Sequence, residues 1–168
     1  TEFESYALKS LNTFKKDKRS YKLNGGYNYG ESSKVRSSEN WNIELRYDYA
    51  LSDHNSLYLG EVAEADRFSG IRRRYNTDLG FKYTFIKSDH IHFLAELGYR
   101  YSIEQNIDQT IALLKDSKGR VYLEGSKTLK SNIKGKFWLE YLPNFSRSQD
   151  YLINLEPSLL ISLTSVFS

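Results

Sequence analysis

The sequence contains no cysteine, no methionine and only two prolines among its 168 residues. Without cysteine, neither a disulfide framework nor a cysteine-ligated zinc site can form. No run of about 20 apolar residues occurs, so no membrane-spanning helix is predicted. A charged segment followed by an apolar stretch, which would mark a signal peptide, is also lacking. These absences exclude disulfide-rich domains and helical membrane proteins.

Charge is plentiful but dispersed along the chain. Charged residues make up 27% of the sequence and the net charge is only +3. Because no basic arm or acidic tail is present, we expect no nucleic-acid partner. Aromatic residues make up 15%, with 14 tyrosines among them. Such a composition suits either a membrane barrel with aromatic girdles or a soluble β-domain.

Apolar and polar side chains alternate with a period of two, which predicts strands with two unlike faces. The alternation is clear over residues 21–29, 41–51, 75–85, 91–101, 133–141 and 151–167. It is weaker over residues 3–15 and 119–129, and it changes phase within 57–66, which indicates a bulge. About nine strands result, and most have the roughly 9 to 11 residues that cross a membrane.

The connections between these strands are predicted to alternate in length. Short turns are expected at 16–18, 52–55, 87–89 and 130–131, and longer links at 31–39, 68–73, 103–118 and 144–150. Short turns on one rim and long loops on the other are typical of outer-membrane proteins. The fold class is therefore all-β, an antiparallel up-and-down transmembrane β-barrel.

Strand direction bears on whether that barrel is whole. If the short turns are periplasmic, the strand at residues 3–15 runs downward and the strand count is odd. Native barrels normally begin in the periplasm and have an even count. We expect residues 1–168 to be a single outer-membrane domain, trimmed at one or both ends, and thus an incomplete portion of a larger even-stranded barrel. The alternative is that residues 3–15 and 151–167 pair directly and close a small barrel.

The two faces of the strands have opposite predicted roles. One face is apolar and rich in tyrosine, and we expect it to meet lipid: Leu45, Tyr47, Leu79, Phe81, Tyr83, Phe93 and Leu97. The other face carries charges of both signs and is predicted to line the lumen: Glu44, Arg46, Asp48, Asp78, Lys82, Glu96, Arg100, Lys134, Lys136 and Glu140. A soluble barrel that binds an apolar ligand would reverse these faces.

Four short pieces between Ser37 and Tyr101 resemble one known family. They are Glu44-Leu45-Arg46-Tyr47-Asp48-Tyr49, Asp66-Arg67-Phe68-Ser69-Gly70, Leu79-Gly80-Phe81-Lys82-Tyr83 and Leu97-Gly98-Tyr99-Arg100-Tyr101. In order and spacing they are similar to the salt-induced outer-membrane proteins, the YdiY-like domain of unknown function. The resemblance implies a β-barrel in the cell outer membrane and implies no activity. Members of that family usually have an earlier strand and a further C-terminal hairpin.

No catalytic or metal-binding pattern emerges. His90 and His92 are two residues apart on one strand, but no carboxylate spacing completes a metal site, and His54 falls in a turn. No phosphate-binding loop or nucleophile elbow occurs. We therefore expect no enzymatic activity, no cofactor and no metal.

Arginines cluster after the Asp66-Arg67-Phe68-Ser69-Gly70 piece. Arg67, Arg72, Arg73 and Arg74 could contact lipopolysaccharide phosphates from a cationic outer rim. A hairpin whose turn uses Gly70 and whose arginines pair with nearby acidic side chains explains the same residues, and we favour that interpretation.

The function predicted from the sequence is a non-enzymatic outer-membrane barrel of structural or small-pore type with a mixed-charge lumen. Its expected partners are outer-membrane lipid and lipopolysaccharide. One alternative is a scaffold barrel that docks other envelope proteins in a larger assembly. Another is a soluble β-barrel that binds an apolar ligand.

Overall fold

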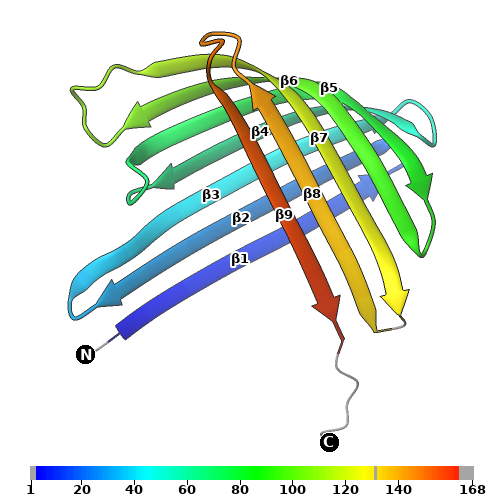
Figure 1. Ribbon diagram of the computed structural model, residues 1–168, viewed down its shortest axis with the longest axis horizontal. Coiled ribbons are helices and arrows are strands. Elements are labelled where there is room, and N and C mark those ends of the chain that lie inside the picture. Colours follow the sequence, from blue (N-terminus) through cyan, green and yellow to red (C-terminus); the bar gives the residue numbers. More distant parts are fainter. Residues whose placement is uncertain (1–2, 131, 163–168) are drawn as a thin grey trace, which may run out of the picture.

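The protein is a single antiparallel sheet in which every strand pairs with its neighbours in sequence (Figure 1). The computed structural model describes residues 3–130 and 132–162. The strands are β1 (Phe3–Lys16), β2 (Arg19–Ser32), β3 (Val35–Ala50), β4 (Asn55–Asp66), β5 (Ile71–Lys87), β6 (Ile91–Asn106), β7 (Leu114–Lys130), β8 (Ile133–Pro143) and β9 (Tyr151–Ile161). The predicted all-β, antiparallel, up-and-down class is confirmed. No helix in the described part of the chain is long and apolar enough to cross a membrane.

The strands follow the alternation of the sequence, including its weak segments. The poorly alternating residues 3–15 form β1, and the apolar-poor residues 119–129 lie inside β7. The phase change predicted within 57–66 corresponds to a register shift between Glu64 and Asp66, at the end of β4. Backbone pairing thus extends strands through segments whose side chains give little signal.

The lengths of the turns alternate less regularly than the sequence predicts. The long link expected at residues 31–39 is wrong, because β2 and β3 continue to a tight turn at Ser33 and Lys34. Both residues have positive φ, 51° and 64°, as in the two-residue turns that match strand twist. The link expected at 103–118 is also shorter and spans residues 107–113, whereas the loop at 144–150 lies as predicted.

The sheet curls into a half-barrel with two open edges (Figure 1). Over the described residues, β1 pairs only with β2 and β9 pairs only with β8, so the direct closure of residues 3–15 on 151–167 is not formed there. Every residue of β1 is exposed. The outer N–H and C=O groups of these two edges are therefore available for pairing.

The polarity of the two faces is inverted relative to a soluble domain. The buried polar and charged side chains are Asp48, Asn76, Asp78, Thr84, Glu96, Ser102, Asp116, Arg120, Glu140 and Asn144. By contrast, Tyr58, Ile71 and Leu142 are the buried hydrophobic ones in the described part of the chain. Large apolar side chains such as Leu79 and Leu97 are instead 59% and 66% exposed. The concave face is polar and the convex face is apolar.

Candidate functional site

A continuous group of charged side chains crosses the concave face of the half-barrel. We call it the concave network, and its members are Arg46, Asp48, Tyr58, Asp78, Lys82, Glu96, Arg100, Arg120 and Glu140. They come from β3, β4, β5, β6, β7 and β8. Four cations meet four carboxylates, so the network carries no net charge.

Arg46 organises the β3 side of the network. Its guanidinium donates to both oxygens of Asp48, at 3.0 and 3.1 Å, and to both oxygens of Glu96, at 2.5 and 3.1 Å. The guanidinium carbon also lies 4.3 Å from the centre of the Tyr58 ring. Lys82 of β5 binds Asp48 from the other side. All five donors of an arginine can be used in such a fork, which a lysine cannot reproduce.

Arg120 of β7 holds the opposite side of the network. Its Nε donates to Glu140 at 2.7 Å, and its Nη1 donates to Glu96 at 2.6 Å and to the Tyr58 hydroxyl at 3.0 Å. Only 8% of its side chain is exposed. Because Arg46 and Arg120 share Glu96, the two halves form one network.

Arg100 of β6 extends the network toward the edge at β9. It binds both oxygens of Asp78 at 2.7 Å and donates to Glu140 at 3.1 Å. Glu140 also accepts a hydrogen bond from the Asn154 amide of β9 at 3.1 Å. Charge-assisted, two-pronged bonds of this kind fix the geometry of both partners.

Tyr58 lies flat over two glycines, and this allows the network to cross the sheet. It is 2% exposed. A Cβ atom added at Gly80 would lie 2.5 Å from the Tyr58 hydroxyl oxygen, and one at Gly98 would be closer still. Tyr58 and these glycines are successive partners across β4, β5 and β6. Any larger residue at either position would displace the ring, so the aromatic side chain fills the space that the glycines leave.

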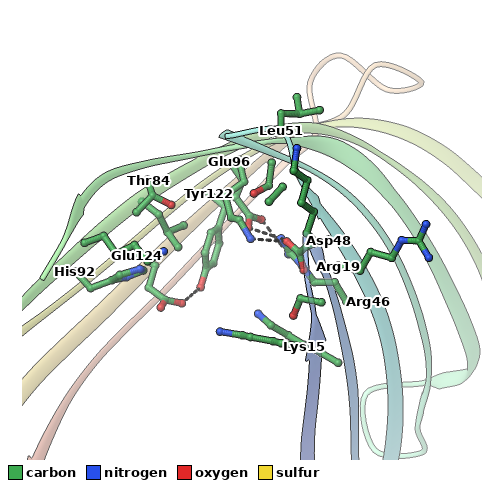
Figure 2. Close-up of a pocket in the computed structure, with 18 of the residues that line it drawn as sticks. Lys15, Arg19, Arg46, Asp48, Leu51, Thr84, His92, Glu96, Tyr122 and Glu124 are labelled. Carbon is green, nitrogen blue, oxygen red and sulfur yellow. Dashed lines mark hydrogen bonds and ion pairs between the residues drawn. The ribbon is translucent and has the colours of Figure 1, made fainter. Parts of the chain in front are cut away.

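A hollow of about 1120 Å³ lies against the network on the side of the turns that join β1 to β2, β3 to β4 and β5 to β6. Figure 2 shows Lys15, His92, Glu124 and Tyr122 around it, with Arg46, Asp48 and Glu96 near its inner end. Tyr122 donates to Glu124 at 2.8 Å and stacks on Trp138 with ring centres 6.1 Å apart. The lining thus offers hydrogen-bond donors, acceptors and aromatic faces in one space.

The predicted lumen residues all lie on the concave side, but they do not all join the network. Glu44 instead accepts a hydrogen bond from the Asn24 amide at 2.9 Å. Lys136 is 48% exposed and lies 3.7 Å from Glu124, while Lys134 is exposed near the end of β8. The other predicted charges, from Arg46 to Glu140, form the network described above.

The seven residues predicted to face lipid lie on the convex face. Leu45, Leu79, Phe81, Tyr83 and Leu97 are exposed there, by 39% to 66%. Tyr47 and Phe93 are half-buried by aromatic neighbours, since Tyr47 packs against Tyr21 and Phe93 against Phe85. Whether this face meets lipid stays a prediction.

The four arginines considered for lipopolysaccharide contact do not form one cluster. Arg74 is held between Glu64 and Glu104 at 3.1 and 2.7 Å, and Arg67 lies 3.8 Å from Glu39. Arg72 and Arg73 are exposed. These ion pairs fit the structural explanation of the hairpin.

The Asp66-Arg67-Phe68-Ser69-Gly70 piece owes its sequence to a turn. The Asp66 carboxylate accepts hydrogen bonds from the backbone N–H groups of Phe68 and Ser69 and from the Ser69 hydroxyl, at 2.8 to 3.0 Å. Gly70 has a φ of +76°, which residues with a side chain rarely adopt. The local geometry accounts for Asp66, Ser69 and Gly70.

The histidines do not converge on a site. His54 shares a hydrogen bond with the Thr84 carbonyl at 2.6 Å and stacks on Tyr83, and His92 lines the hollow while His90 is exposed at the β5–β6 turn. Within residues 3–130 and 132–162, no three His, Asp or Glu side chains are grouped to hold a metal ion.

Three residues on this face, Tyr58, Arg120 and Tyr122, were not among the residues predicted from the sequence. Tyr58 lies in the segment whose alternation changes phase, and the other two lie in the apolar-poor part of β7. A usable signal was present, because Tyr58, Gly80 and Gly98 form a large-small-small set on facing strands. Recognising it required the register of β4 with β5 and β6.

A family model described as "Protein of unknown function, DUF481" matches residues 1–168. A search of curated proteins finds no significant match.

Proposed function

We propose that this chain, which belongs to the DUF481 family of proteins of unknown function, is a non-enzymatic outer-membrane β-barrel with a constricted, charge-balanced lumen. The observation that carries the proposal is the inverted polarity of the two faces. Ionised groups such as Asp48 and Glu96, both 4% exposed, are buried on the concave face, while leucines cover the convex face. In water this arrangement exposes a large apolar surface, whereas lipid is the solvent that such a surface suits.

Strand length and aromatic placement support a membrane location. The strands have 11 to 17 residues, at least the roughly 9 to 11 that a tilted strand needs to cross a bilayer. Tyr83 near one end of β5 and Tyr75 near the other are both about 40% exposed on the convex face. Tyrosines suit the two membrane–water interfaces, where ring and hydroxyl meet different solvents. The resemblance to YdiY-like salt-induced outer-membrane proteins supports the same location.

The network supports a narrow passage rather than a wide channel. Its side chains lie across the concave face from β3 to β8 and bind one another, and the hollow lies beside them. Because both charge signs line the same space, any conductance is expected to be small and weakly ion-selective.

A soluble barrel that binds an apolar ligand fits these observations less well. Such a protein needs an apolar interior, and here the concave face holds the ion pairs while the convex face holds the leucines. A scaffold role in a larger envelope assembly is a second candidate function, since the open edges at β1 and β9 can accept further strands.

Fractionation of cells that produce the intact protein tests the proposal. We expect it to sediment with outer membranes and to resist extraction by high salt or sodium carbonate. On denaturing gels the unheated sample is expected to migrate differently from the boiled one, because a closed barrel resists detergent until heated. Recovery in the periplasmic or cytoplasmic supernatant would contradict the proposal.

A further inference from the structure

Two lysines and a serine at one end of the hollow have no partners for their polar groups. Lys15 of β1 is directly paired with Ser20 of β2, and Lys22 follows two residues later on the same face. All three line the hollow. In Figure 2 the Lys15 side chain reaches into the hollow below the network. The three residues therefore lie on β1 and β2, at the open β1 edge of the half-barrel.

The nearby carboxylates are already bound by other groups. Among the described residues, neither the Lys15 nor the Lys22 amine lies within 4.0 Å of a carboxylate. Asp48, the partner of Ser20 on β3, is held by Arg46 and Lys82. Glu44 is engaged by Asn24. Neither lysine therefore forms an ion pair with a carboxylate of the described residues.

The register places further positive charge beside Lys22. Across the β2–β3 ladder its direct partner is Arg46, and like charges in that position repel. Arg46 and Lys82 both bind Asp48, so Lys22 is a further cation on this side of the network. Asp17 and Asp53 lie exposed in the turns at the mouth of the hollow, together with Lys18. Over the whole lining, eight lysines and arginines face seven carboxylates.

Ser20 has a side-chain oxygen that is shielded from solvent and has no hydrogen-bond partner, and no other side-chain atom in the described part of the chain shares this state. Buried hydroxyl groups are normally hydrogen-bonded. A hydroxyl without a partner thus lies on the same face as two amines that form no ion pair, a combination that favours an oxygen-rich anion.

We propose that Lys15 and Lys22, with Ser20 between them, bind a small oxyanion of the phosphate class in this hollow. The arginines of the network are committed to carboxylates, so the groups left to bind a ligand are lysine amines. Amines act as point charges that bind phosphate without requiring the planar fork that carboxylate recognition favours. The inference does not depend on whether the convex face meets lipid.

The test is calorimetric titration of inorganic phosphate into the protein folded in detergent micelles, at constant ionic strength set with sodium chloride. We expect saturable binding that weakens at least tenfold in the double variant Lys15→Gln/Lys22→Gln. The matched control is Lys115→Gln/Lys127→Gln, which removes the same charge from the convex side of β7 and should bind phosphate as the unaltered protein does.

A second titration and a check of folding complete the test. Titration with glycerol phosphate separates a free anion from the phosphate group of a larger solute, and binding of either supports the site. Far-UV circular dichroism verifies folding, and the single variant Lys22→Gln serves if the double variant does not fold. No saturable binding of either phosphate by the unaltered protein, or an equal loss in the β7 control, would overturn the proposal.

Discussion

Arg46 on β3 binds both carboxylate oxygens of Glu96 on β6, although β4 and β5 lie between their strands. The direct partner of Arg46 on β4 is Gly60, and in the next row the Tyr58 ring lies over Gly80 and Gly98, so the guanidinium reaches Glu96 across this ring. A curled sheet with glycines at these positions lets long side chains lie across it. The network therefore depends on the small residues beneath it as much as on its charges.

Removal of Arg120 is expected to be costly. In Arg120→Met, Glu96 and Glu140 lose a buried cationic partner, and breaking a buried pair in this way costs about 3 to 5 kcal/mol. Chemical unfolding in micelles measures the loss. The matched control is Arg36→Met, whose side chain is 41% exposed and pairs with Glu39, itself 32% exposed, and whose loss should cost about 0 to 1 kcal/mol. Equal stability of the two variants would show that the network is not a stabilising feature.

Addition of one methyl group beneath Tyr58 should also destabilise the protein. In Gly98→Ala the new Cβ meets the Tyr58 hydroxyl and lies 2.7 Å from the Leu79 carbonyl oxygen, so a cost of about 1 to 3 kcal/mol is expected from overpacking. Gly135→Ala is the control, because its nearest neighbour would lie at an ordinary 3.7 Å. Tyr58→Leu in the Gly98→Ala background should recover part of the loss. No difference between the two glycine variants would contradict this packing.

A charge placed on the convex face distinguishes lipid from water. Phe81→Arg is expected to cost about 2 to 4 kcal/mol if the residue lies near the bilayer midplane. Tyr151→Arg, at the first residue of β9, is 66% exposed beside Tyr141 on the same face and should cost only about 0 to 1 kcal/mol because it lies near a rim. Refolding into lipid vesicles under a denaturant gradient gives both values. Full tolerance of Phe81→Arg would reverse the assignment of this face.

The strands in which apolar and polar side chains alternate strongly, such as β3, β5 and β6, could be predicted from the sequence, because the polarity of each side chain indicates which face of the sheet it lies on. The tight turn at Ser33 and Lys34 could not, since the polar residues around it resemble a loop although their backbone groups are paired. Arg46 and Glu96 were assigned to the polar face individually. Their contact could not be predicted, because it depends on the curvature of the sheet, which no local pattern encodes.

The most direct test of the central claim is lipid contact at a single site. The chain has no cysteine, so Leu97→Cys and Leu94→Cys can each carry one fluorophore on β6. Leu97 is 66% exposed on the convex face, whereas Leu94 lines the hollow. In vesicles of brominated lipid, we predict strong quenching at position 97 and little at position 94. Equal quenching at both positions, or quenching at position 94 alone, would contradict a membrane barrel with a polar interior.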